Sequence, residues 1–308
     1  ADRGHLLTRF FKRDSTKAGN LQLLETKKDE FWKWVATWAV FINKPSDLGY
    51  DDSKYNLPKL HIHEIEVENI TDEVIVDKYG KPVLFKDNTK SLIDTSREKS
   101  QTVDIRVKKA LEIVKNEGPE DNWILWHHLE SERQAIEKKF LKEKFPSGFV
   151  ILREALNYVR SVYGSQSNKD KEEDLIDFSE GKYQILSTKP KIAGSGCNFQ
   201  HACHKMIFVG IDFKFNDFIQ AVHRVYRFMQ DKEVHIYIIF TQNEREVLKK
   251  LFDKWRKHNE LQTEMISLVR EYGLNSELIK SQMERQIFKN GRKLTIGDAT
   301  LYNNDTVI

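Results

Sequence analysis

Residues 206–240 read MIFVGIDFKFNDFIQAVHRVYRFMQDKEVHIYIIF, and this stretch decides the fold class. Two apolar runs, Met206–Val209 and Val234–Phe240, have the length of buried strands. Between them, the pattern over Asn216–Phe228 favours a helix. A strand, a helix and a second strand in this order are typical of a parallel sheet covered by helices.

The same alternation of strand and helix patterns continues upstream. Strands are predicted at 123–126, 149–152, 159–163 and 183–186, and helices at 104–116, 131–144 and 170–178. Ser131 with Gln134 is expected to cap the second of these helices, and Ser167 the third, which Gly181 ends. A further helix is predicted at 244–258. The chain is therefore expected to be an α/β protein with a parallel sheet flanked by helices.

Two segments differ from this alternation. An N-terminal helical segment is predicted at 31–40, with an aromatic stripe that a core would bury. The stripe consists of Phe31, Trp34, Val35 and Trp38. Polar and apolar residues alternate from Leu60, which predicts a strand, and the runs at 73–77 and 83–85 predict a β-hairpin insertion. The expected divisions are 1–55, 56–260 with the strand and hairpin at 61–103, and 261–308 as a C-terminal helix and connector.

Composition limits the classes of function. Lys and Arg number 50 against 47 Asp and Glu, so the net charge of +3 excludes a tail that binds nucleic acid by bulk charge, and any polyanion site must be local. Two cysteines among 308 residues argue against a disulfide scaffold and suit a reducing, cytoplasmic location. No apolar run approaches the roughly 18–20 residues that span a bilayer, so no membrane association is expected. The sequence starts without Met, and we expect a fragment of a larger protein.

The stretch from Ser187 to Gln230 contains the candidate chemistry. After a strand that closes at Ser187 and Thr188, a loop with Gly194, Gly196 and Asn198 lets backbone N–H groups approach a phosphate or a sugar. A plain tight turn explains two neighbouring glycines equally well.

Two arginines strengthen the interpretation. Gln220, Arg224 and Arg227 recur at i, i+4 and i+7, so a helix would place them on one face, with His223 beside them. Guanidinium forks match phosphate oxygens and stay charged, which favours the binding of a triphosphate. The alternative is a solvated basic face paired with carboxylates.

Residues 220–230, QAVHRVYRFMQ, resemble the last signature motif of Swi/Snf-like ATPases in helicase superfamily two, Q-x-x-x-R-x-x-R-x-G-Q. Residues 212–216 look like the preceding D-x-x-W-N of that family, and Ser187-Thr188 with 194–198 looks like T-x-A-G-G-x-G-x-N. Leu57-Pro58 and 123–127 are similar to the start of the second motor lobe. The motifs stand in the family's order over about 56–258, so the resemblance implies the second RecA-like lobe of a DNA helicase or translocase.

The resemblance also implies roles for single residues. Arg227 would be the arginine finger that reaches the γ-phosphate, Arg224 would support the same charge, and Gln220 would orient the nucleotide. The implied nucleotide-binding residues are Gly194, Gly196, Asn198, Asp212, His223 and Gln230. The implied DNA-binding residues are Ser187, Thr188, Lys189 and His127.

The implied cofactors are ATP and Mg²⁺, and the implied partners are DNA and a first lobe. The sequence has no G-x-x-x-x-G-K-[ST] loop and no Asp-Glu pair after an apolar strand, so we expect both ligands to need a first lobe of the same polypeptide. Residues 1–55 would be a remnant of that lobe and a connector. Negligible ATP hydrolysis is expected from this chain alone, and ATP hydrolysis from the intact protein.

This sequence departs from the family pattern in three places. Met229 replaces the usual Gly, residues 189–192 lengthen the glycine loop, and Asp212 lies close to Gln220. With residues 44–50, these features look more like a prokaryotic and phage-type branch, in which some members are fused to a DNA methyltransferase. Residues 303–305 are similar to the joining segment, which implies a restriction-modification context.

Two other classes of function stay open. Cys197, His201, Cys203 and His204 could suggest zinc, but C-x3-H-x-C-H is compressed for a tetrahedral site, so no metal site is expected. Satisfied or exposed histidines account for the pairs His61/His63 and His127/His128. The chain could also be an inert RecA-like scaffold that binds DNA or protein, although a scaffold has no physical need for two arginines and Gln220.

Overall fold

The computed structural model describes residues 3–13, 21–39, 42–53, 55–68, 101–148, 151–194, 196–212, 214–272, 281, 295–296 and 299–300. The β-hairpin predicted within 73–85 and the connector segment at 303–305 lie outside these residues. The chain divides into two compact units, one of residues 56–255 and one that combines 1–55 with 256–308.

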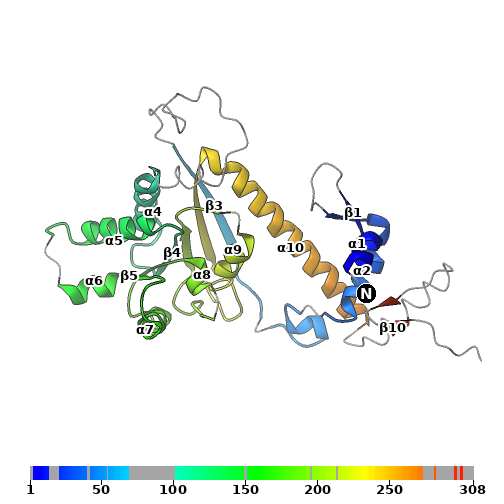
Figure 1. Ribbon diagram of the computed structural model, residues 1–308. Helices are drawn as coiled ribbons and strands as arrows, with labels where there is room; N and C mark the ends of the chain where they lie inside the picture. The colour runs from blue at the N-terminus through cyan, green and yellow to red at the C-terminus, as the bar shows by residue number, and fades with distance from the viewer. Residues whose placement is uncertain are drawn as a thin grey trace, which may run out of the picture. The chain divides into compact units, whose positions relative to one another are not determined.

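The larger unit is built on a six-stranded sheet in the order β3-β8-β7-β4-β6-β5, in which every neighbouring pair is parallel. The strands are β3 (Leu60–Val67), β4 (Trp123–Trp126), β5 (Val159–Val162), β6 (Ile185–Thr188), β7 (Lys205–Phe208) and β8 (Val234–Thr241). Helices separate them along the chain (Figure 1). The predicted α/β class, a parallel sheet flanked by helices, is confirmed.

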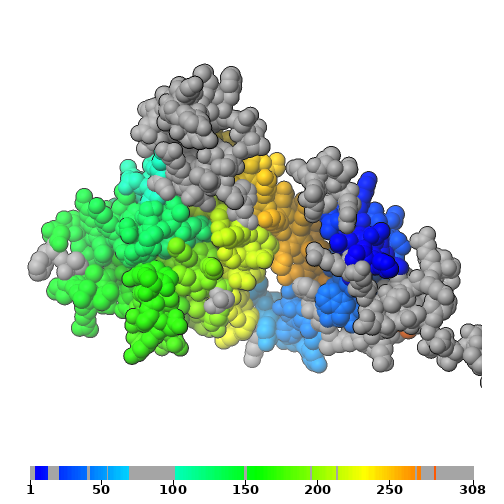
Figure 2. All heavy atoms as spheres, viewed as in Figure 1, coloured from blue at the N-terminus to red at the C-terminus, as the bar shows by residue number. Residues whose placement is uncertain are grey.

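The two faces of the sheet are covered by different helices. On β4, Trp123 and Leu125 pack with α4 (Val103–Glu117) and α5 (Glu130–Lys144), whose atoms form the cyan and green surface in Figure 2. Ile124 and Trp126 point to the other face, because side chains alternate along a strand. That face is covered by α7 (Asn168–Ser179), α8 (Pro190–Ala193), α9 (Phe215–Val222) and the start of α10 (Arg245–Tyr272), which follows a 3-10 turn, η3 (Gln242–Glu244).

Two helix starts test the predicted caps. Ser167 accepts a hydrogen bond from the Asp170 N–H at 3.1 Å and caps α7, as predicted, and Gly181 follows the end of that helix with a φ of 72°. Ser131 does not cap α5, which begins one residue earlier. Instead the Glu132 carboxylate accepts the backbone N–H groups of His128 and Leu129, at 2.7 and 2.9 Å.

The predicted strand at 149–152 is wrong where the structure describes it. Leu152 opens a short helix, α6 (Leu152–Tyr158), and Ile151 precedes it as the N-cap residue. The run of apolar residues was too short to distinguish a strand from the first turn of a helix.

The smaller unit contains α1 (Arg3–Phe10), β1 (Phe11–Arg13), β2 (Leu21–Leu23), η1 (Glu25–Lys27), α2 (Lys28–Ala36), η2 (Pro45–Leu48), β9 (Thr295–Ile296) and β10 (Ala299–Thr300). Trp32, Val35 and Ala36 of α2 pack around Met265 of α10. The predicted stripe is therefore wrong at Trp38, which lies beyond the helix end and is 64% exposed. None of the helices in the described part of the chain has the length and apolar character needed to span a bilayer.

Candidate functional site

The two motif arginines lie in a turn after α9, and not on the helix. The helix ends at Val222, with His223 as its C-cap, and residues 223–230 form the arginine turn. The N–H groups of Arg224 and Val225 reach back only three residues, to Ala221 and Val222, which tightens the chain out of the α-helix. The predicted helix over 216–228 is therefore confirmed for 216–222 and wrong for 223–228, and the shared helical face of Gln220, Arg224 and Arg227 is wrong.

Gln230 holds the arginine turn from inside. Its side chain is 5% exposed, and its amide nitrogen lies 2.9 Å from the Gln200 carbonyl oxygen, 3.0 Å from that of Cys203 and 3.4 Å from that of Val225. Its amide oxygen accepts the Lys232 N–H at 3.0 Å. These contacts occupy both amide hydrogens, so the predicted nucleotide contact of Gln230 is replaced by a supporting role.

The glycine loop (Gly194 and residues 196–199) binds directly to the arginine turn. Arg224 Nη1 donates to the Cys197 carbonyl oxygen at 2.9 Å, and Arg227 Nη1 donates to Asn198 Oδ1. In return, the Phe199 N–H donates to the Arg224 carbonyl oxygen at 3.1 Å. Two segments that the sequence separates by about 25 residues therefore form one site.

Gln220 and His223, the other predicted contacts of this motif, stand next to the arginines. The Gln220 carbonyl oxygen accepts from Arg224 Nε at 3.2 Å, and its side chain is exposed. His223 is exposed too, and its Nδ1 lies 3.1 Å from the Tyr226 carbonyl oxygen. The structure thus brings Gln220, His223, Arg224, Arg227 and Asn198 together.

The arginine turn carries two positive charges that the fold does not neutralise. Burial, and the charge of Arg227 second, lower the pKa of Arg224. No described carboxylate forms an ion pair with either guanidinium, whereas most other buried or half-buried arginines of this unit, such as Arg106, Arg133 and Arg160, have one. Two neighbouring guanidinium groups that are partly removed from water favour an anionic ligand.

Backbone geometry at three positions in the site restricts which residue fits there. A Cβ atom on Gly194 would lie 2.0 Å from the Pro190 carbonyl oxygen, so no side chain fits there. Gly196 has a φ of 80°, in the left-handed region that glycine favours. Met229 has a φ of 65°, and it is the residue that stands where the resembled motif has Gly. The chain keeps the glycine conformation at Met229 without the glycine.

Three of the four predicted DNA contacts are buried. Ser187 and Thr188 are fully buried on β6, and Thr188 Oγ1 donates to the Val162 carbonyl oxygen at 2.8 Å. His127 is fully buried as well, and burial lowers its pKa to about 4, so it is neutral at pH 7. These three predictions are wrong for direct contacts, and only Lys189 of the set reaches solvent, at the start of α8.

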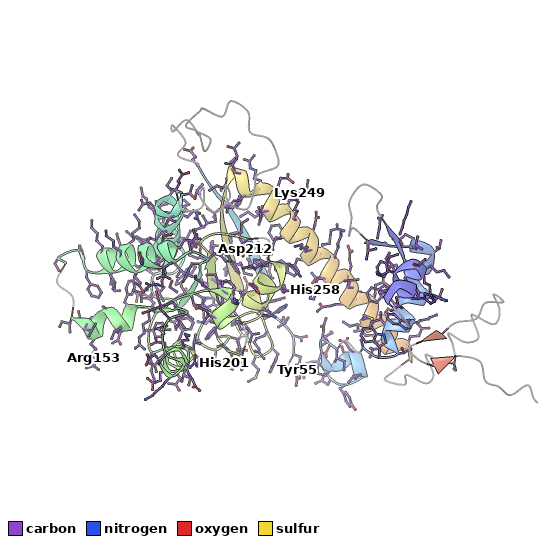
Figure 3. The ribbon with its side chains drawn as sticks, in the orientation of Figure 1. Tyr55, Arg153, His201, Asp212, Lys249 and His258 are labelled. Carbon is purple, nitrogen blue, oxygen red and sulfur yellow. The ribbon has the colours of Figure 1, made fainter. Side chains whose placement is uncertain are left out.

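Asp212 does not join the arginines. It lies between the end of β7 and the start of α9, whereas Arg224 and Arg227 follow the end of α9, so the length of that helix separates Asp212 from the arginines. Figure 3 labels Asp212 and, in the segment after the loop, His201. Asp212 Oδ2 lies 3.5 Å from His128 Nδ1, and both residues line a pocket with Pro190 and Phe208. Asp212 was predicted to bind the nucleotide, but the structure places it beside His128 and not beside the arginines.

No prediction from the sequence covered a buried ion pair that contacts the segment between β7 and Asp212. Arg106 of α4 and Glu132 of α5 are both fully buried and bonded to each other. Arg106 Nη1 also donates to the Val209 carbonyl oxygen at 2.9 Å, just before Asp212 in the chain. Its position on the apolar stripe of α4, between Val103 and Val107, was the available signal.

Burial dominates the environment of both cysteines in the rival set of Cys197, His201, Cys203 and His204. Cys203 is fully buried, its Sγ lies 3.0 Å from the Lys205 carbonyl oxygen, and burial raises its pKa to about 12, so it stays a thiol. Burial also raises the pKa of Cys197. Among the residues that the structure describes, His201 and His204 do not converge with these cysteines on one point.

Known proteins match part of this chain. Residues 133–229 match the family described as helicase conserved C-terminal domain. The matched region begins in α5 and includes both the glycine loop and the arginines of the turn. No curated protein matches the sequence.

Two solved structures are similar to the chain at low identity. One is the crystal structure of the C-terminal part of the Fun30 ATPase domain, with 16% identity, a TM-score of 0.39, and coverage of 56% of this chain and 55% of that chain. The other is the C-terminal domain of the DEAD-box protein Dbp5, with 14% identity, a TM-score of 0.40, and coverage of 54% of this chain and 90% of that chain. The chain thus spans about half the length of the Fun30 structure.

Proposed function

We propose that this chain supplies the C-terminal motor lobe of an ATP-dependent DNA helicase or translocase. The observation that carries the proposal is the pair Arg224 and Arg227, held by the glycine loop and left without a carboxylate partner among the described residues. The helicase C-terminal domain that contains them supports the same function.

In this proposal the two arginines act on ATP held by a first lobe. Arg227 would reach the γ-phosphate and Arg224 would support it, since fixed positive charge stabilises the charge that develops on the transferring phosphoryl group. Asn198 Oδ1 and the Cys197 carbonyl oxygen orient the guanidinium groups, because each accepts one of their hydrogen bonds. Closure and opening of the lobes with each hydrolysis would then move the motor along DNA.

Magnesium is expected on the first lobe. Asp212, the carboxylate predicted for the nucleotide site, precedes α9 and pairs with His128, whereas the arginines follow α9, so Asp212 is not placed to hold magnesium beside them. Mg²⁺ would supply charge neutralisation at the phosphates. ATP hydrolysis by this chain alone is therefore expected to be negligible.

Contact with DNA would involve the backbone phosphates. Lys189 is the charged member of the predicted set that reaches solvent, and phosphate contacts position a strand without reading its sequence. A prokaryotic or phage-type origin, a DNA methyltransferase in the same polypeptide and a cytoplasmic location belong to this proposal, and they rest on the sequence resemblance.

The test is DNA-stimulated ATP hydrolysis by a polypeptide that joins this chain to its first lobe. Arg227→Ala should lower kcat by about 10³-fold or more, as loss of an arginine finger does, while Arg227→Lys should recover little because a lysine lacks the fork. Asn198→Ala should lower kcat less. Arg153→Ala on α6 is the matched control, since this exposed arginine is remote in sequence from the site.

Full activity in Arg227→Ala would overturn the assigned role. If neither the wild type nor any variant hydrolyses ATP while the wild type still binds DNA, the result would instead support the scaffold function.

A further inference from the structure

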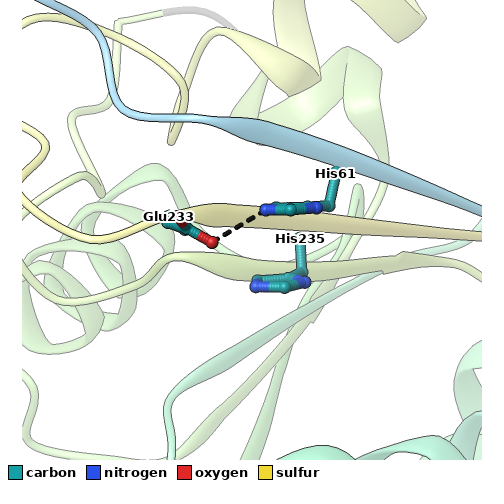
Figure 4. A group of neighbouring side chains, drawn as sticks. All are labelled: His61, Glu233 and His235. Carbon is teal, nitrogen blue, oxygen red and sulfur yellow. Dashed lines mark hydrogen bonds and ion pairs between the residues drawn. The ribbon is translucent and has the colours of Figure 1, made fainter.

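A cluster of histidines lies across two neighbouring strands of the sheet, β3 and β8. In the parallel pairing of β3 and β8, His61 lies opposite His235, and His63 lies opposite Tyr237. Glu233 precedes β8, and its Oε2 accepts a hydrogen bond from His61 Nε2 at 2.8 Å. Figure 4 shows both imidazole rings with a nitrogen turned toward the Glu233 carboxylate.

The potential ligand atoms of the three residues are close together. One ring nitrogen of His61, one of His235 and a carboxylate oxygen of Glu233 all lie within 4.8 Å of one another. In a tetrahedral zinc site with bonds of about 2.1 Å, ligand atoms are separated by about 3.4 Å. Small rotations of side chains that are partly solvent-accessible would therefore bring these atoms to coordination distance.

A second contact fixes the orientation of His235. Its Nδ1 lies 3.2 Å from His63 Nε2, and the ring of His63 stacks on Tyr237 at a centroid distance of 4.4 Å. When Nδ1–H donates to His63, the Nε2 atom of His235 carries a lone pair. Histidine ligands of metals are commonly held in this way, by a hydrogen bond on the ring nitrogen that does not bind the metal.

The chemistry of the three ligand groups suits a divalent cation. Two imidazole nitrogens and one carboxylate oxygen are ligands that first-row metals such as zinc accept. Burial, and second the charge of a neighbouring histidine, lower the pKa of His235. Lys205 is the cationic residue that acts on His235.

We propose that His61, Glu233 and His235 form a zinc site that links β3 to β8. The ligands would be Nε2 of both histidines and a carboxylate oxygen of Glu233, with water in the fourth position. Two imidazole ligands favour zinc and related first-row metals over Mg²⁺ and Ca²⁺, which take oxygen ligands. On binding, His61 would carry its proton on Nδ1 and turn its Nε2 lone pair to the metal, so coordination would replace its hydrogen bond to Glu233.

This site shares no residue with the arginine turn, and the zinc proposal does not depend on the proposed function. The site would hold β3 to β8, which are neighbours in the sheet but are the first and last of its strands along the chain. Its structural role predicts a change in stability, which can be measured without any activity.

The experiment uses the whole chain without an affinity tag, because a polyhistidine tag would bind the probe. Metal-free protein is titrated with Zn²⁺ by calorimetry and with Co²⁺ by absorption spectroscopy, and thermal unfolding is followed with and without Zn²⁺. We expect one equivalent of each metal to bind and Zn²⁺ to raise Tm. Glu233→Gln and His235→Ala should abolish tight binding and the rise in Tm.

Two more variants separate this site from others. His63→Ala should weaken zinc binding by about 10–100-fold without removing it, the effect typical of a residue that orients a ligand. His201→Ala, in the rival cysteine-containing set, should bind Zn²⁺ as the wild type does. Circular dichroism of each metal-free variant confirms that it is folded, and Glu233→Gln is nearly isosteric.

Three results would overturn the proposal. They are the absence of Zn²⁺ binding in folded wild type, binding that survives in Glu233→Gln and His235→Ala at full affinity, and binding lost in His201→Ala alone.

Discussion

Replacement of Glu132 by glutamine removes one charge from the buried Arg106–Glu132 pair with little change in shape. Both side chains are 0% exposed, and the carboxylate also accepts two backbone N–H groups before α5. The introduced glutamine would keep one oxygen for the backbone, but its amide nitrogen would turn a second donor toward Arg106. The guanidinium would then remain charged and buried without a counter-ion.

The expected loss in free energy of unfolding is about 3–5 kcal/mol, which is the typical result of removing one partner from a buried ion pair. For a unit of roughly 200 residues, each kcal/mol lowers Tm by about 2–4 °C, so Tm should fall by roughly 6–20 °C. Adding Arg106→Met should recover part of the loss, because no buried charge is then left unpaired.

Guanidinium chloride unfolding followed by circular dichroism measures the change. The matched control is Glu137→Gln on the same helix, where the carboxylate pairs with Arg133 at 2.7 Å near the surface and should contribute at most about 1 kcal/mol. Equal effects of the two substitutions, or a loss below about 1 kcal/mol in Glu132→Gln, would refute the reasoning.

The same pair predicts a dependence on acid. Burial opposes ionisation of Glu132, but the Arg106 charge and the two N–H groups outweigh it and lower the pKa. The stabilisation is therefore complete above the unfolded pKa of about 4.3 and is lost as the pH falls below it. The difference in stability between wild type and Glu132→Gln should shrink below about pH 4.

Three further predictions concern single positions. Met229→Gly should stabilise the fold by about 1 kcal/mol in urea unfolding, because relief of the left-handed φ of 65° exceeds the entropy that glycine adds to the unfolded chain, and a destabilisation would contradict this. Ser167→Ala should cost about 1 kcal/mol through loss of the Asp170 N–H bond, and Ser167→Asp should retain most of it. A thiol reagent should modify Cys197 in the folded protein but Cys203 only after unfolding, since Cys203 is buried and its pKa is raised to about 12; rapid reaction of both would exclude this packing.

Strands and helices with strong apolar patterns could be predicted from the sequence. The strand at Trp123–Trp126 matches β4 residue for residue, and the helix at 104–116 differs from α4 by one residue at each end. Both patterns are local and are set by burial on neighbouring elements of the same sheet. The short run at 149–152 failed because four apolar residues fit a strand or a helical turn.

The sequence predicted which residues form the site more accurately than it predicted their arrangement. The glycine loop and the arginines do meet, but the helix that was expected to carry Arg224 and Arg227 ends at Val222. Its end depends on Gln230, whose amide binds carbonyl groups from a segment 30 residues earlier, and local spacing carries no trace of such a contact. Propensity alone cannot place a helix end that tertiary hydrogen bonds decide.

The exposure of single side chains and the pairing register of the strands could not be predicted from the sequence. Thr188 and His127 end adjacent parallel strands, where ligands commonly bind, yet the helices that cover the sheet bury both side chains. Likewise, local sequence does not connect His61 and His63 with Glu233 and His235, because only the pairing of β3 with β8 brings these residues together.

The position of β3 at one edge of the sheet has a consequence for the order of folding. Its strand partner among the described residues, β8, is made roughly 170 residues later, so during synthesis β3 waits about 10–30 s before it can pair with β8. An unpaired strand attracts other strands in that interval. Half of the eight residues in Leu60–Val67 are histidine or glutamate, at 61, 63, 64 and 66, and this polarity suits a segment that must stay soluble until translation completes its partner.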